Sequence, residues 1–120
     1  MKVKEIVLKK VKRINPLTHE VIKNPDGTEA YLSYREQLWS ILHGVGRQEG
    51  ITTAELMQRA QIQFLLQDAK DEETIYFTPE QFATLDRVLD ETRWVIVDSL
   101  TANFIKDIKE AKEVEVEPKK

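Results

Sequence analysis

The sequence predicts an α+β fold that is mainly helical, with an N-terminal β-hairpin packed on a four-helix domain. Three observations predict it. The first 23 residues are rich in β-branched side chains and contain a turn signal. Three later segments each begin with a helix-capping pattern and continue with apolar residues at helical spacing. The chain has 120 residues and no cysteine, which suits a single hydrophobic core that forms without disulfides.

The hairpin, a β-ribbon, is expected over residues 3–23. Its first strand covers residues 3–14, because Val and Ile are frequent there and no N-cap residue precedes them, although a helix could use the same apolar spacing. A short second strand at 21–22 pairs back across the turn at 15–18. Residues 24–27, Asn-Pro-Asp-Gly, follow as the strongest turn signal of the chain, since proline presets one φ and glycine takes the positive φ that closes the turn.

Four helices are expected, over about 34–45, 53–69, 79–92 and 96–111. Hydroxyl side chains at Ser33, Thr52 and Thr78 predict the first three starts, because each is followed three residues later by Glu or Gln, as in a capping box. A bend near Arg93-Trp94 separates the last two helices. Residues 1–112 form one domain, and residues 113–120 form a disordered charged tail.

The helix over 53–69 carries more apolar residues than one buried face needs. Its main stripe consists of Leu56, Met57, Ala60 and Phe64. The stripe is widened by Ile62, Leu65, Leu66 and Ala69. A stripe this broad indicates burial on more than one side. After an acidic loop, residues 75–77 are a candidate for a short third strand beside the ribbon.

The net charge of −3 is unevenly distributed. Residues 1–23 hold seven Lys or Arg and two Asp or Glu, a charge of +5, which leaves −8 for the rest. A basic ribbon on an acidic helical body indicates an interaction surface, although lysines on an edge strand also serve to prevent unwanted strand pairing. The candidate surface consists of Lys9, Lys10, Lys12, Arg13, Trp39 and Trp94. Trp39 lies off the main apolar face of its helix, so it is either exposed or packs under the hairpin.

No catalytic residue, cofactor site or metal site is predicted. His19 and His43 lack the spacing of metal ligands, and the acidic loop at 68–73 lacks the alternating oxygen ligands and central glycine of a calcium loop. No Gly-rich phosphate loop is present. The longest apolar run, at 94–97, is too short to span a bilayer, and no apolar signal-peptide core follows the start. We therefore expect a soluble, non-enzymatic protein that is not exported and does not contact membranes.

A nucleic-acid-binding protein is the alternative hypothesis. The run from residue 35 to 60 resembles the opening of a winged-helix domain, with a helix, a glycine-containing loop and a second capped helix. The recognition helix would then include residues 61–67, which contain no Lys or Arg to neutralise phosphates. The basic ribbon could contact nucleic acid only as an arm.

One further likeness rests on Asn24-Pro25-Asp26-Gly27-Thr28, Leu32-Ser33-Tyr34-Arg35-Glu36-Gln37-Leu38, Glu55-Leu56-Met57-Gln58-Arg59-Ala60 and Phe77-Thr78-Pro79-Glu80-Gln81-Phe82, followed by Trp94 and Phe104-Ile105. In this order of elements, the chain resembles small accessory proteins from the virion-assembly gene blocks of tailed phages and prophages. The resemblance covers about 3–108 and departs at the loop 47–50 and in the tail. It implies a non-enzymatic assembly or scaffold protein that binds a phage structural or assembly protein, or itself. It also implies a location in the bacterial cytoplasm or on the virion, and no functional residue carries over.

Overall fold

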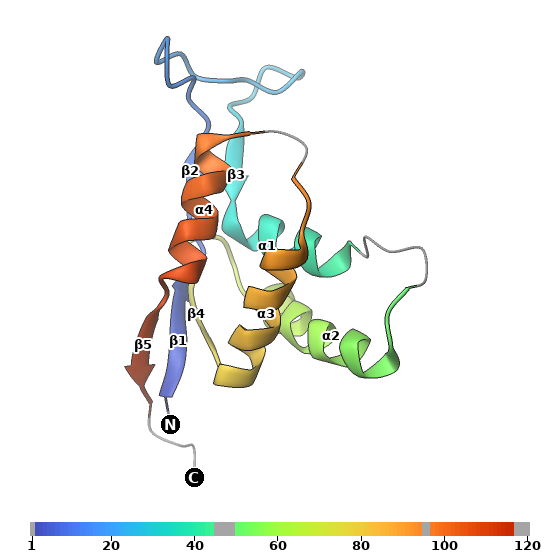
Figure 1. The fold of residues 1–120 in the computed structure, drawn as a ribbon. Helices are drawn as coiled ribbons and strands as arrows, with labels where there is room; N and C mark the ends of the chain where they lie inside the picture. Colours follow the sequence, from blue (N-terminus) through green and yellow to red (C-terminus); the bar gives the residue numbers. More distant parts are fainter. Residues whose placement is uncertain (1, 45–49, 95–96, 117–120) are drawn as a thin grey trace.

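A computed structural model describes residues 2–44, 50–94 and 97–116 of the chain. The strands in this part are β1 (Lys2–Val7), β2 (Lys10–Lys12), β3 (Tyr31–Ser33), β4 (Thr74–Phe77) and β5 (Lys112–Glu115). The helices are α1 (Tyr34–His43), α2 (Thr53–Asp68), α3 (Pro79–Glu91) and α4 (Ser99–Lys109). The predicted fold class, α+β and mainly helical, is confirmed (Figure 1).

The N-terminal strand lies in the middle of a sheet of order β4-β1-β5, in which both pairings are antiparallel. Lys4 lies opposite Phe77 on one side, and Val3 lies opposite Val114 on the other. The expected third strand near 75–77 is therefore present as β4, beside the first strand. A separate antiparallel pair joins β2 to β3, with Val11 opposite Leu32.

The predicted hairpin over 3–23 is wrong in its pairing. Residues 3–14 divide into β1 and β2, and β2 pairs with β3 rather than with residues 21–22. Residues 21–22 do pair back across the turn, through a bridge between Ile14 and Val21 and a hydrogen bond from the Ile22 amide to the Arg13 carbonyl at 3.0 Å, but they do not extend into a strand. These residues belong to an arm, residues 13–30, which extends from the body between β2 and β3 (Figure 1). Within the arm, the Asn15 side chain accepts the amides of residues 17 and 18 in a local turn.

The predicted disordered tail over 113–120 is also wrong where the structure describes it. Residues 112–115 form β5 and pair with β1, with Glu115 opposite Lys2. The alternation of Glu and Val suits a strand once an unpaired edge is available, which the charged composition alone does not reveal. Residues 117–120 lie outside the described part of the chain.

The helix starts expected from capping boxes are present. The Ser33 hydroxyl accepts the amide of Glu36, and the Thr52 hydroxyl accepts that of Glu55, each at 3.2 Å. The start of α3 has the reciprocal capping box, with Thr78 and Gln81 bonding each other's backbone amides. These three helices begin within one residue of their predicted starts.

The fourth helix begins later than predicted. Asp98 is its N-cap and accepts the amide of Leu100, so α4 starts at Ser99 instead of residue 96. Val97, which falls inside the predicted helix range, precedes the N-cap and is fully exposed. Residues 95–96 lie outside the described part of the chain, as does residue 45, the last residue of the first predicted helix.

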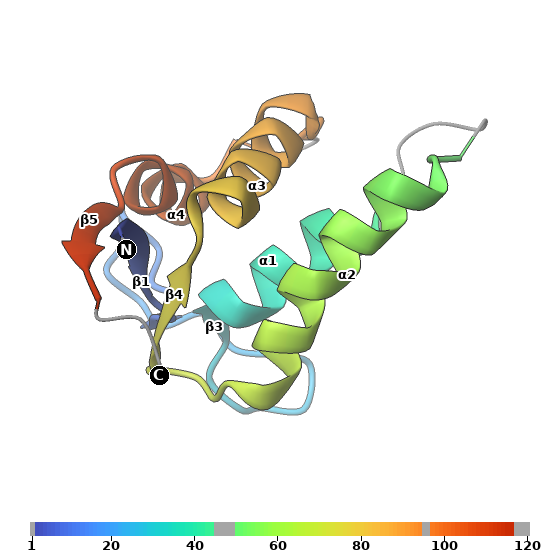
Figure 2. The ribbon, with the colours of Figure 1, turned by 90° about the horizontal axis from the view of Figure 1, so that it is seen from below.

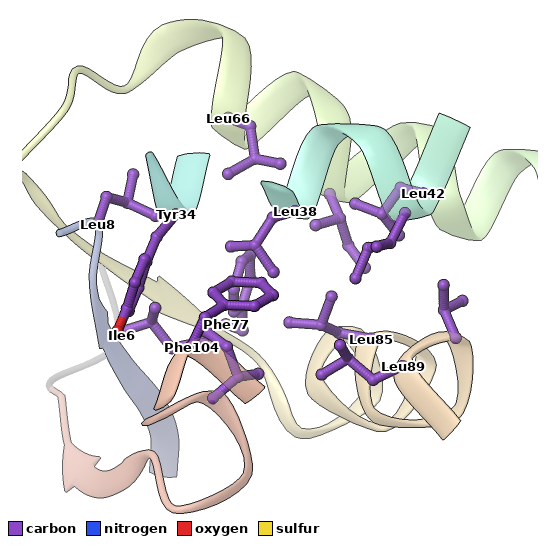
Figure 3. Packing of buried hydrophobic residues seen from close by; sticks show 14 of the residues in the cluster. Ile6, Leu8, Tyr34, Leu38, Leu42, Leu66, Phe77, Leu85, Leu89 and Phe104 are labelled. Atoms are coloured by element: carbon purple, nitrogen blue, oxygen red, sulfur yellow. The ribbon is translucent and has the colours of Figure 1, made fainter. Parts of the chain in front are cut away.

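All four helices and the strands β1, β3 and β4 contribute to one hydrophobic core (Figure 3). Phe77 and Phe104 are completely buried near its centre, and the Tyr34 ring meets the Phe104 ring edge-on at 5.0 Å. From α2, however, the core receives Ile62 and Leu66. The predicted main stripe, Leu56, Met57, Ala60 and Phe64, lies outside the core, so the expected burial of α2 on more than one side is wrong.

Candidate interaction surface

The predicted basic surface is largely paired with acidic residues within the chain. Lys9 Nζ lies 3.1 Å from Asp107 Oδ2, and Arg13 Nη1 lies 3.0 Å from Asp98 Oδ2, because α4 runs beside β2 (Figure 1). Partial burial alone would raise the pKa of each aspartate. Hydrogen bonds outweigh this effect and lower both pKa values: Arg13 donates to Asp98, and Tyr34 and Lys9 donate to Asp107. Both carboxylates therefore stay ionised beside the basic residues.

The other two basic candidates also have partners. Lys12 Nζ lies 2.9 Å from Glu29 Oε2, and their hydrogen bond raises the pKa of Lys12 and lowers that of Glu29. Lys10 Nζ lies 4.8 Å from the centre of the Tyr31 ring, at cation–π distance. The charge contrast between ribbon and body is thus reduced by folding, since the two parts neutralise each other locally.

The two tryptophans occupy different settings. Trp39 is partly buried against the core. It lines an open hollow of about 500 Å³ together with Arg35, Glu36, Ser40 and Gln67. This hollow lies between α1 and α2, and none of the four basic candidates lines it. Trp94 follows the end of α3 and is exposed. No described contact unites the six predicted residues into one site, so their role as an interaction surface stays a prediction.

A different surface emerges on α2. We define the outer face of α2 as Leu56, Met57, Ala60 and Phe64, which recur at helical spacing. Leu56, Met57 and Phe64 are exposed by 52%, 51% and 59%. In Figure 2, α1 and α3 lie toward the interior of the molecule from α2, which forms its outer edge. Three large apolar side chains on one face of the helix are therefore left in water.

The same side of α2 is poor in charge. The helix holds three charged residues, of which Glu55 and Arg59 are not exposed and Asp68 is exposed at the C-terminal end. Glutamines occupy positions 58, 61 and 67 around the outer face. Interface cores are depleted in charged residues and enriched in aromatic residues and Met, and the outer face of α2 has this composition.

A buried polar network fixes the orientation of α2. Arg59, 9% exposed, donates from Nε to Glu55 at 2.9 Å and from Nη1 to the carbonyls of Leu42 and Gly44 at 3.3 Å. Arg87 of α3 donates to the other oxygen of Glu55 at 2.5 Å, and this bond is the main reason why the pKa of Glu55 lies below its usual value. Arg59 thereby satisfies the last carbonyls of α1, while Glu55 joins α2 to α3.

Sequence reasoning missed this arrangement, although a signal was present. Glu55 and Arg59 are four residues apart, on the same side of the helix as Ile62 and Leu66. An ion pair of this spacing is usually assigned to the solvated face. Here it marks the buried face, so the apolar stripe opposite is the exposed one.

Two other kinds of feature are not found among the described residues. Within 2–44, 50–94 and 97–116, no group of three or more His, Cys, Asp or Glu residues could hold a metal ion. None of the helices in these ranges is long and apolar enough to cross a membrane. Comparison of the chain with family models, with curated proteins and with solved structures finds no match. The candidate surface therefore rests on the chain's own residues.

Proposed function

We propose that this protein is a non-enzymatic protein-interaction module whose contact surface is the outer face of α2. One observation carries the proposal: in a chain with 32% charged residues, this helix turns an uncharged, half-exposed apolar face to solvent. The exposed area of its large side chains is on the order of 300 Å², at the lower end of the range for the largest apolar patch of a typical monomer, which is often functional. Binding a protein would remove this area from water.

A role in virion assembly is part of the proposal. The partner would then be a structural or assembly protein of a tailed phage or prophage, or a second copy of the chain, and the setting would be the bacterial cytoplasm or the virion. What supports this role is the order of elements that the chain shares with such proteins. Nucleic acid is the less favoured partner, because Lys9, Lys12 and Arg13 face carboxylates of the chain itself.

The test is size-exclusion chromatography with light scattering, on the chain alone and mixed with the products of the genes that flank its own. Phe64→Glu places a charge in the proposed contact and should weaken any complex by at least about 30-fold, the effect of a central interface residue. Leu17→Glu is the matched control, since Leu17 is 89% exposed on the arm. A wild-type chain that stays monomeric and binds none of these proteins would refute the proposal, as would a complex that Phe64→Glu leaves intact.

A further inference from the structure

We infer that the outer face of α2 binds the same face of a second copy, in an antiparallel two-fold dimer centred on Ala60. This inference rests on the proposed function and names its partner. A two-fold interface brings one surface patch against itself, so the patch must be complementary to its own rotated copy. The positions, charge and size of the outer face can each be compared with that requirement.

The positions are symmetric about Ala60. Leu56 and Phe64 lie four residues on either side of it, and Thr53 and Gln67 lie seven residues on either side. Antiparallel pairing about Ala60 therefore places Leu56 against Phe64 of the second copy at both ends of the contact. The small side chain of Ala60 at the crossing point lets the two helices approach closely. Each half of the contact then contains one aliphatic and one aromatic side chain.

The charges favour a second copy over an unlike partner. Each chain carries −3, so two copies repel unless they meet through an uncharged surface. The outer face of α2 has no charge of its own, and Glu55 and Arg59 are bonded to each other on the buried side. The one exposed charge of the helix, Asp68, lies at its C-terminal end, four residues beyond Phe64. The surrounding glutamine amides both donate and accept hydrogen bonds, so they can pair with their own kind across the axis. An acidic or basic partner would find no opposite charge here.

The area predicts a weak dimer. A helix of 16 residues is about 24 Å long, so two copies of this face and its flanks bury on the order of 1,000 Å² in total. Specific interfaces usually bury about 1,600 Å², and about 1,000 Å² is the lower limit for a biological one. We therefore expect a dissociation constant on the order of 10 μM, with rapid exchange between monomer and dimer.

The first experiment measures the average molecular mass by sedimentation velocity at protein concentrations from about 1 to 200 μM, a range that brackets the expected dissociation constant. The mass should rise from the 14.0 kDa of one chain toward twice that value. Phe64→Glu should weaken the association at least about 30-fold, while Leu17→Glu should leave it unchanged. Circular dichroism of both variants verifies that they are folded.

The second experiment tests the direction of pairing. The chain has no cysteine, so single substitutions give unambiguous cross-links. Oxidised Ala60→Cys should form a disulfide dimer across the axis. Thr53→Cys alone should not, since the two sites would lie about 20 Å apart, whereas a mixture of Thr53→Cys and Gln67→Cys should cross-link. Efficient cross-linking of Thr53→Cys with itself would indicate parallel helices and overturn the arrangement.

The outcomes also distinguish this inference from the proposed function. A chain that is monomeric at 200 μM, but binds a flanking gene product in a manner lost in Phe64→Glu, overturns the dimer and leaves the interaction module intact. A dimer that Leu17→Glu disrupts as strongly as Phe64→Glu does would overturn the assignment to α2. A dimer with the expected variant and cross-linking pattern supports both proposals.

Discussion

Replacement of Arg59 by methionine tests whether the buried polar network holds α2 in place. The substitution removes the ion pair with Glu55 and leaves the carbonyls of Leu42 and Gly44 without the guanidinium. Removal of one partner of a buried ion pair costs about 3–5 kcal/mol. Glu55 keeps its bond to Arg87, and the methionine side chain restores apolar contact, so we expect a loss of about 3 kcal/mol in the free energy of unfolding.

Two further variants divide this loss into parts. Arg59→Lys keeps the charge but not the planar fork that reaches the two carbonyls at 3.3 Å, so it should cost about 1–2 kcal/mol. Arg87→Met should cost no more than about 1 kcal/mol, because the Arg87 side chain is 43% exposed. Urea unfolding followed by circular dichroism, at a concentration below dimer formation, measures all three variants. A loss below about 1 kcal/mol for Arg59→Met, or one equal to that of Arg87→Met, would refute this account of α2.

Three more predictions follow from described contacts. The hydrogen bond from Arg87 is the main reason why the pKa of Glu55 lies below its usual value of 4.5. The ionised Glu55 therefore stabilises the fold fully above pH 4.5, and this stabilisation is lost as the pH falls through the lower pKa of the folded state. Acid unfolding of Glu55→Gln should accordingly depend less steeply on pH than that of the wild type. Gln63→Met should raise the free energy of unfolding by about 1 kcal/mol in the same urea assay, because the buried Gln63 Nε2 has no hydrogen-bond partner, and a destabilised variant would contradict this. Duplex DNA should show no mobility shift at low salt, since Lys9 and Lys12 have acidic partners within the chain. A shift that weakens steeply with salt would favour the nucleic-acid alternative.

The features that sequence alone predicts are local ones. A capping box links residues three apart, so the starts at Ser33, Thr52 and Thr78 follow from short sequence patterns. Strand pairing depends on contacts distant in sequence. The first strand pairs with residues from both the middle and the end of the chain, and no local pattern specifies these partners. The arm and the C-terminal strand were mispredicted for this reason.

The role of the basic residues likewise depends on contacts distant in sequence. Whether the charge of the ribbon is available to a partner depends on Asp98 and Asp107, which are far along the chain but close to Arg13 and Lys9 in space. A regional net charge predicts an external field only if opposite charges do not fold against it. In this structure the basic residues that first indicated a partner surface pair within the chain. Lys9 and Arg13, which flank β2, pair with Asp107 of α4 and with its N-cap Asp98, and Lys12 pairs with Glu29 of the arm.

The outer face of α2 could not be predicted because hydrophobicity does not distinguish the two sides of this helix. One side offers Ile62 and Leu66, and the other offers Leu56, Met57 and Phe64, so burial of either would remove comparable apolar area from water. What distinguishes the two sides is the ion pair of Glu55 and Arg59, which lies on only one of them. With Ile62 and Leu66 inward, Arg59 caps α1 and Glu55 bonds to α3, and rotation of the helix would forfeit both interactions. The network thus selects which apolar face is buried, and it leaves the face with Leu56, Met57 and Phe64 in solvent.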